Sequence, residues 1–432
     1  MTSDKYVAID LGSSCISAMA AEIQENGALK ILAVESKPTT PEEITHGIIT
    51  QVSGTAFKIS EIIKLIQNSA RISEIDQISI SIGARSLKNI GVSVSRFVTT
   101  NKIVTSSLID EMILECEKKV QGSNVAIYDI IPLNYELDGH TTNEPINQTA
   151  TQITGHYNVI YGSEVIALGI DKCFDRTLGI VLDHAPLSIE ALSAAVLDES
   201  DREDGCALID FGAATTTLGI YKHGVLQQLS VIPLGGKNIT QDIQELGISL
   251  THAEKFKHLK GCAMENKIEN PVYIQIPSIE AEKPPVKIST KFLATIIEAR
   301  IEEILQPVFE AINTYPESLE AGIVITGGAS KLNNLIDYIF EKTGMYTRFG
   351  SHEEWLSEKS NPELADPAYS QLIGTIALTH EYRQLHPKVA NPETTETDGG
   401  KAKEKEKKKK RNLKDTIASK LMIFFGDENT MN

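Results

Sequence analysis

The sequence predicts an α/β fold with two related halves that face each other across a cleft. The first observation is an apolar, β-prone run that ends in Asp10 and turns at Gly12. The second is the same order 200 positions later, where another apolar run ends in Asp210 and turns at Gly212. In both copies a strand, a turn and a further strand follow, which indicates that a whole three-stranded unit is duplicated.

The first copy is expected to hold three strands and then a helix. Asn26-Gly27 is a strong hairpin signal that joins the second strand to the third. The helix is expected because isoleucines recur at helical spacing between Ile59 and Ile66. The expected strands are residues 6–10, 15–23 and 29–36, and the expected helix is 57–71.

The second copy is expected to repeat the three strands, with His223-Gly224 as the turn between the last two. An extra α/β segment, about residues 84–166, separates the two copies. Its expected elements are strands at 91–99 and 125–137 and a helix at 106–120.

Beyond the second copy the pattern is mostly helical and is interrupted by prolines. Residues 271–289 are expected to form a hairpin whose loop holds Pro277, Pro284 and Pro285. The remaining expected elements are a long helix at 290–313, a buried strand at 321–326 and a closing helix at 366–384.

Composition is that of an ordinary soluble globular protein, with 41% hydrophobic and 23% charged residues. No run of 18 apolar residues occurs, and the polar N-terminus does not resemble a secretory signal. The five cysteines show no C-x-x-C spacing, so reduced core thiols are expected rather than disulfides or a zinc site. The net charge is −17, and an acidic body argues against nucleic-acid binding.

The two Asp-x-Gly turns have the chemistry of phosphate loops. A strand that ends in Asp places a carboxylate at the mouth of a sheet, and the following Gly lets backbone N–H groups approach a phosphate. Asp10 and Asp210 are expected to face each other and to hold Mg²⁺ through waters. Ser13, Ser14 and Thr215 would add hydroxyl contacts to phosphates. One such turn is also common in plain hairpins, so the duplication is what favours a binding site.

A third glycine loop follows the buried strand at 321–326. Gly327, Gly328 and Ala329 are expected to let the backbone pass close to a ribose or an adenine, although a simple strand-to-helix turn is the alternative. Gly235 and Gly236 offer another close-approach site in the same half. The chain has no Walker A loop and no G-x-G-x-x-G dinucleotide loop.

The order of the three loops resembles the actin/Hsp70/sugar-kinase superfamily, and within it the FtsA family of bacterial cell-division proteins. Residues 251–257, followed by Gly261-Cys262-Ala263, resemble that family's helix under the adenine. Residues 276–285 with 297–300 resemble its fourth subdomain, and residues 321–329 follow the family pattern throughout. The resemblance extends from residue 5 to about residue 384.

This resemblance implies an actin-like fold with four subdomains and a cleft for ATP and Mg²⁺. Glu254 and Lys257 would contact the adenosine. The fourth subdomain would receive the C-terminal peptide of FtsZ, with Arg300 as the candidate contact; an exposed Arg on a solvated helix face is the alternative. The implied subdomains are 1A (residues 1–83, 167–203 and 360–386), 1C (84–166), 2A (204–234 and 319–359) and 2B (235–318).

The resemblance also bears on catalysis. Superfamily members often carry an acidic residue two places after the Thr of the second loop, where this chain has Thr217. We therefore expect at most a weak ATPase that acts mainly as a nucleotide-dependent structural adaptor. No catalytic residue is assigned, and Glu190, in the helix that connects the halves, is not given that role.

The C-terminal tail differs from the body. Residues 401–414 carry nine Lys and Arg and two Glu, whereas residues 1–400 have a net charge of −22. Residues 387–411 are expected to be a disordered basic linker, and residues 412–425 an amphipathic helix that binds an anionic membrane. A tail that packs on the body or binds a partner protein is the alternative. The expected membrane-facing residues are Leu413, Ile417, Leu421, Phe424 and Phe425.

The family resemblance and the tail together favour a peripheral membrane protein of the division site. It would bind ATP, polymerise on the inner face of the cytoplasmic membrane and tether FtsZ filaments there. The runner-up is an assembly ATPase of type IV pili of the PilM kind, which usually lacks such a tail. A sugar or acid kinase is a further alternative, and an Hsp70-type chaperone is disfavoured because no β-rich substrate domain follows.

Overall fold

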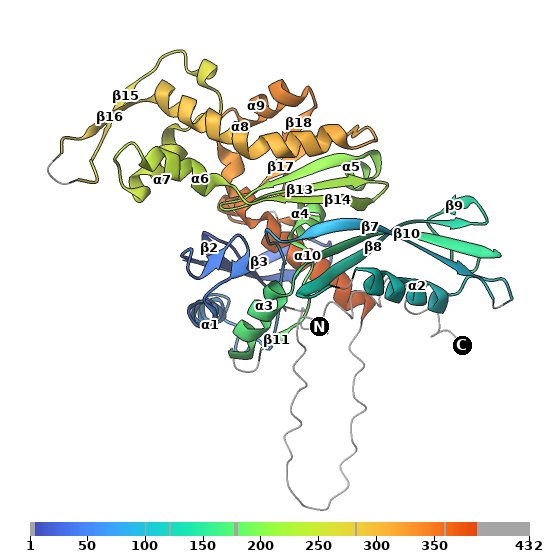
Figure 1. Cartoon of the computed structure of the whole chain (residues 1–432). Helices are drawn as coiled ribbons and strands as arrows, with labels where there is room; N and C mark the ends of the chain where they lie inside the picture. The colour runs from blue at the N-terminus through green and yellow to red at the C-terminus, as the bar shows by residue number, and fades with distance from the viewer. Residues whose placement is uncertain are drawn as a thin grey trace, which may run out of the picture.

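The computed structural model contains two halves, each built on a five-stranded sheet (Figure 1). It describes residues 5–99, 101–120, 122–176, 180–280, 283–357 and 360–386. In Figure 1 the first half lies below, the second half above, and an inserted sheet extends to the right. Within these described ranges, no helix is both long and apolar enough to cross a bilayer. The tail predicted to bind a membrane lies outside the described residues.

The first sheet has the strand order β11-β6-β1-β2-β3. β1, β2 and β3 are antiparallel neighbours, as the sequence predicts, while β6 and β11 add to the other edge in parallel. Asp10 stands near the end of β1, opposite Ser17 of β2. The strands are β1 (Lys5–Leu11), β2 (Cys15–Ile23), β3 (Leu29–Pro38), β6 (Gln77–Ile80) and β11 (Val181–Leu182).

The second sheet has the order β14-β13-β12-β17-β18 and repeats the pattern of the first. β12 pairs antiparallel with β13 and parallel with β17, just as β1 pairs with β2 and β6. Asp210 stands near the end of β12, opposite Thr217 of β13. The predicted duplication is therefore confirmed. The strands are β12 (Cys206–Phe211), β13 (Thr216–Lys222), β14 (Val225–Ile232), β17 (Gly322–Thr326) and β18 (Thr347–Phe349).

Helices of the first half cover its sheet, and two of them differ from prediction at their starts. α1 begins five residues earlier than predicted and ends before Arg71, whose φ of 54° cannot continue a helix. α10 begins at Ser370, because Pro367 and the capping side chain of Asp366 form a short 3₁₀ turn before it. The helices are α1 (Val52–Ser69), α3 (Val165–Arg176), α4 (Ser188–Val196) and α10 (Ser370–Leu385). The short helix α5 (Glu199–Asp204) packs on β13 of the second half.

The inserted segment is a four-stranded sheet, β7-β10-β8-β9, with α2 packed on it (Figure 1). The helix α2 and the strand β8 match the predicted ranges. The strand β7 begins three residues and ends two residues before its predicted range. The long strand β10 was not predicted. The elements are β7 (Lys88–Phe97), α2 (Ser106–Lys119), β8 (Val125–Leu137), β9 (His140–Thr142) and β10 (Gln152–Ser163).

The inserted sheet is joined to the second half through two buried or half-buried asparagines. Asn158 Nδ2 donates to the carbonyl of Leu226 at 2.9 Å, and Asn89 Oδ1 accepts from the backbone N–H of Leu229 at 3.1 Å. Asn89 Nδ2 also donates to Asn158 Oδ1 at 2.9 Å. These bonds use polar groups on the outer side of β14, the edge strand of the second sheet.

A helical part with one hairpin lies on the second half, as predicted (Figure 1). β15 and β16 form that hairpin, and its loop holds the three prolines. Ser289 caps the long helix α8, which packs its isoleucines and leucines into the core of this half. The elements are α6 (Gly236–Gln244), α7 (Leu250–Lys260), β15 (Tyr273–Ile276), β16 (Val286–Ser289), α8 (Thr290–Thr314) and α9 (Leu335–Thr343).

Candidate functional site

A cleft of about 1130 Å³ opens between the two halves. Residues of both sheets and of α6, α7 and α10 line it. Of the residues predicted to bind a nucleotide, all except Gly235 lie in this lining. Those brought together are Asp10, Gly12, Ser13, Ser14, Asp210, Gly212, Thr215, Gly236, Glu254, Lys257, Gly327, Gly328 and Ala329.

Two carboxylates, those of Asp10 and Asp210, line the cleft, and their charges interact. Burial raises the pKa of Asp10 to about 6, although a hydrogen bond from Gln371 Nε2 (2.7 Å) opposes the shift. Burial raises the pKa of Asp210 to about 7, and the nearby charge of Asp10 adds to the shift. Such a pair resists full ionisation without a cation, because like charges in a desolvated site repel each other. The donor set therefore fits a divalent cation.

The cation would need ligands from outside the protein. Among the described residues, no group of three or more His, Cys, Asp or Glu side chains is arranged to hold a metal. Mg²⁺ prefers six oxygen ligands and keeps several waters when only one or two carboxylates are offered. Asp10 and Asp210 thus fit a Mg²⁺ that is also bound by waters and by oxygens of a ligand.

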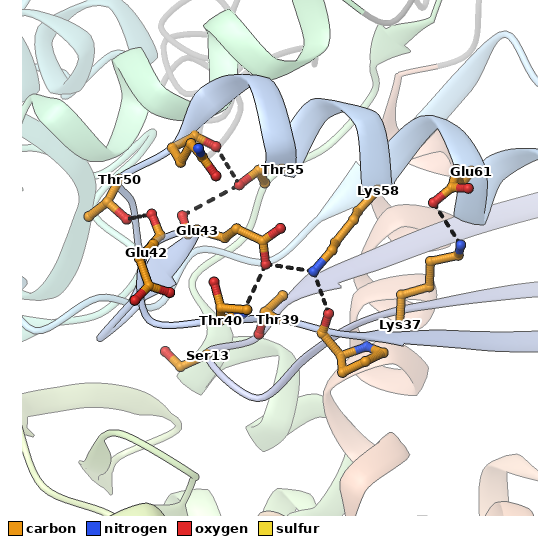
Figure 2. Close-up of polar contacts among 12 residues, drawn as sticks. Ser13, Lys37, Thr39, Thr40, Glu42, Glu43, Thr50, Thr55, Lys58 and Glu61 are labelled. Carbon is orange, nitrogen blue, oxygen red and sulfur yellow. Dashed lines mark hydrogen bonds and ion pairs between the residues drawn. The ribbon is translucent and has the colours of Figure 1, made fainter.

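The first predicted phosphate loop is the tight turn between β1 and β2. Thr39 holds it from behind, since its hydroxyl donates to Gly12 O at 3.0 Å and its N–H donates to Ser14 O at 2.9 Å. Figure 2 shows the polar contacts that continue this support into α1. Lys58 Nζ lies 2.6 Å from Glu43 Oε2, which also accepts from the N–H of Thr40 at 2.9 Å. This support was not predicted.

The second predicted phosphate loop, the turn between β12 and β13, is held by the start of α6. The N–H groups of Gly236 and Lys237 donate to Gly212 O (2.9 Å) and Ala213 O (2.8 Å). A Cβ at position 235 would lie 2.6 Å from Gly212 O, so glycine there is required by the packing of the loop against the helix. Gly235 is buried beneath the loop, and its contact with a nucleotide remains a prediction.

In the third loop, two adjacent glycines have different surroundings. Gly327 has a φ of +91°, and a Cβ on it would lie 2.4 Å from Asp210 Oδ1, so protein packing requires glycine there. A Cβ on Gly328 would meet no protein atom within 4 Å. Because Gly328 lines the cleft, its missing side chain leaves open space against the backbone, as close approach by a ligand requires.

Glu254 and Lys257 lie on α7 and contact each other. Lys257 is buried, and its Nζ donates to Glu254 Oε2 (2.9 Å), Thr240 Oγ1 (2.8 Å) and Gly236 O (3.0 Å). Burial lowers the pKa of Lys257, and Glu254 opposes the shift. The three donors of this ammonium are thus used within the protein, and the predicted contacts of both residues with adenosine remain predictions.

Arg300 lies on α8, away from the cleft lining. Its guanidinium forms a two-point ion pair with Asp242 of α6, with Nη2 at 2.8 Å from Oδ1, and it also contacts Glu303. The hydrogen bond to Asp242 raises the pKa of Arg300 above its ordinary value. The side chain of Arg300 is half-buried and ion-paired, so it differs from the exposed, solvated Arg that was the alternative prediction. Its contact with a partner peptide is untested.

Comparison with known proteins agrees with this geometry. A family model described as cell division protein FtsA matches residues 207–374. A cell division protein FtsA from Neisseria meningitidis is 27% identical over 406 residues, which are 92% of this chain and 95% of that protein. The FtsA of Bacillus subtilis is 27% identical over 76% of this chain and 74% of its own length. The predicted resemblance to the FtsA family is confirmed.

Solved structures show the same fold for this chain. A PilM–PilN type IV pilus biogenesis complex matches with a TM-score of 0.62 and 16% identity, over 87% of this chain and 98% of that one. MreB5 of Spiroplasma citri bound to ADP matches with a TM-score of 0.55 and 13% identity, over 88% and 97%. The predicted actin-like fold is confirmed, and the chain is an actin-like cell-division protein.

Three residues of the site were missed from the sequence. Gln371 reaches Asp10 from α10, Thr39 supports the first loop, and Lys237 Nζ donates to the carbonyl of Ser13 across the cleft at 2.6 Å. Gln371 and Thr39 are far from any motif, and nothing local points to them. Lys237 directly follows the Gly235-Gly236 pair, and a basic residue beside a close-approach glycine was a usable signal.

Proposed function

We propose that this chain binds ATP with Mg²⁺ in the cleft between its halves. The observation that carries the proposal is that Asp10 and Asp210, whose charges interact, line one cleft together with the open backbone of Gly328. The fold supports it, since solved structures of MreB5 with the same fold carry ADP or AMPPNP.

Each part of the cleft would hold one part of the nucleotide. Asp10 and Asp210 would bind Mg²⁺ through waters, and the bound ion would neutralise charge on the phosphates. The hydroxyls of Ser13, Ser14 and Thr215, with the backbone N–H groups around Gly12 and Gly212, would contact the phosphates. Gly235, Gly236, Glu254, Lys257 and the third loop (Gly327, Gly328 and Ala329) would surround the adenosine.

We further propose that ATP sets the assembly state more than it drives turnover. Thr217 stands opposite Asp210 in β13 and lines the cleft, where superfamily members often carry an acid. Hydroxyl groups do not act as a general base at neutral pH, so a slow hydrolysis is expected. This chain would be a nucleotide-dependent adaptor with at most weak ATPase activity.

The cellular role follows from the family. The chain would polymerise on the inner face of the cytoplasmic membrane at the division site and tether FtsZ filaments there. A shared fold with the MamK double helical filament, at a TM-score of 0.51, supports a polymer. The predicted subdomain 2B, residues 235–318 with Arg300, would receive the FtsZ C-terminal peptide, and residues 412–425 would bind the anionic membrane surface.

Calorimetric titration of the full chain with ATP and Mg²⁺ tests the nucleotide site. Asp210→Asn keeps the shape of the side chain but removes its charge, so the affinity for Mg-ATP should fall at least tenfold. Asp337→Asn, on the exposed first turn of α9, is the matched control and should keep the wild-type affinity. Equal affinity for the two variants would refute the role of Asp210, and absence of ATP binding to the wild type would refute the proposal.

A further inference from the structure

Lys237 occupies an unusual position between the two phosphate loops. Its backbone lies in the first turn of α6, where its N–H donates to Ala213 O in the second loop at 2.8 Å. Its side chain crosses the cleft, and Nζ donates to Ser13 O in the first loop at 2.6 Å. One residue thus touches both loops, from opposite halves of the molecule.

Among the described residues, Lys237 has no carboxylate within ion-pair distance. Of the three other lysines in the cleft lining, two are paired: Lys257 with Glu254 at 2.9 Å and Lys331 with Asp366 at 2.7 Å. The third, Lys255, has no ion pair with a described residue, but unlike Lys237 it has no hydrogen bond to a phosphate-loop carbonyl. Lys237 forms no ion pair with any described residue, and Ser13 O is the one acceptor found there for its three N–H donors. Its ammonium is half-buried in the cleft and retains donors for an additional anionic partner.

The cleft would need such a cation when a polyphosphate enters. Asp10 and Asp210 already place two carboxylates in its lining. A polyphosphate adds several negative charges, and one Mg²⁺ supplies only two positive charges. Burial lowers the pKa of Lys237, and the charges of Cys15 and Glu254 oppose this shift. The lowered pKa means that burial disfavours the charged ammonium, and an anion beside it would stabilise the charged form.

We propose that Lys237 is a phosphate-binding residue of this chain, which leaves the Ser13 carbonyl and donates to the polyphosphate of the bound nucleotide. The inference rests on the proposed nucleotide function and deepens it. The distance from Nζ to Ser13 O places the ammonium beside the backbone of the first loop, whose N–H groups are expected to contact the same phosphates. Lys237 therefore adds a positive charge from the protein to that of Mg²⁺ in neutralising the polyphosphate.

A purely structural role is the competing explanation. In that case the side chain would only hold the two halves together through Ser13 O. Lys237→Gln separates the two roles, because the amide of Gln can still donate to a carbonyl but carries no charge. Lys237→Met removes both the donor and the charge, and Lys237→Arg keeps both.

The experiment is calorimetric titration of the full chain with ATP, ADP and adenosine, each with Mg²⁺ and with EDTA. Lys237→Gln and Lys237→Met should weaken ATP and ADP binding about tenfold, the usual value of a charge-assisted hydrogen bond, and leave adenosine binding unchanged. The loss should be larger in EDTA, where no Mg²⁺ neutralises the phosphates. Lys237→Arg should stay within about threefold of wild type.

Lys64→Met is the matched control, because Lys64 is exposed on α1 and the variant changes net charge equally. It should bind all three ligands like the wild type. Equal weakening of ATP, ADP and adenosine by Lys237→Gln would overturn the inference in favour of a structural role, and so would unchanged ATP binding. A wild-type chain that binds none of the ligands would overturn the proposed function itself, and the inference with it.

Discussion

Neighbouring glycines in the third loop show how one residue type can serve two purposes. Gly327 is required by the protein, because its positive φ and its closeness to Asp210 exclude a side chain. Gly328 is not required by packing, because a Cβ there meets no protein atom within 4 Å. Glycine at position 327 is therefore explained by protein packing, whereas glycine at position 328 is explained by the space that a ligand would need.

Alanine substitutions at these two positions should affect different quantities, the free energy of unfolding at Gly327 and the affinity for ATP at Gly328. Gly327→Ala should lower the free energy of unfolding by roughly 1–3 kcal/mol, the usual cost of a strained backbone. Gly328→Ala should stay within about 0.5 kcal/mol of wild type, yet weaken ATP binding by narrowing the cleft. Denaturant unfolding and calorimetry measure the two quantities. Tight ATP binding by Gly328→Ala would mean that no ligand approaches this backbone.

The residues of the cleft were predictable to the extent that they lie in local motifs. Asp10 and Asp210 end strands in duplicated turns, and the structure brings both into one cleft. Gln371 reaches Asp10 across 361 positions, and no local pattern encodes that contact. Arg300 shows the same limit, because its pairing with Asp242 depends on how α8 packs against α6.

Elements were predictable where apolar periodicity and turn residues coincide. All six strands of the duplicated unit and the long helix α8 were found in this way. The strand β10 was not predicted, because it contains two glycines and several polar residues, and its pairing with β7 and β8 stabilises it as a strand. The early start of α1 was missed because its first turn, which contains Gly54, lacks an apolar repeat and has a cap residue, Gln51, with no side-chain cap bond.

The contact between β10 and β14 gives a prediction at this scale. Asn158 is buried and bridges Asn89 to the carbonyl of Leu226. Asn158→Leu should leave both groups without that partner and cost about 1–3 kcal/mol in the free energy of unfolding. Gln152→Ala, at the exposed start of the same strand, should cost less than about 0.5 kcal/mol. Equal costs in denaturant unfolding would mean that this bridge does not stabilise the join.

At the scale of the whole molecule, the duplication explains why the site lies between the halves. Each half carries an equivalent strand that ends in Asp, and the two sheets bring these ends to a common cleft. Residues of both halves would contact one nucleotide, so its binding would favour one arrangement of the halves over others. Assembly of an actin-like chain that depends on this arrangement would then follow its nucleotide state.

Electron microscopy of the full chain on an anionic lipid monolayer tests this account most directly. We expect filaments on the monolayer with Mg-ATP, few or none for Asp210→Asn under the same conditions, and no protein on the monolayer after deletion of residues 412–432. The deleted chain should still bind ATP in solution. Filaments of equal abundance for the wild type and Asp210→Asn, or without any nucleotide, would contradict the claim that the cleft controls assembly.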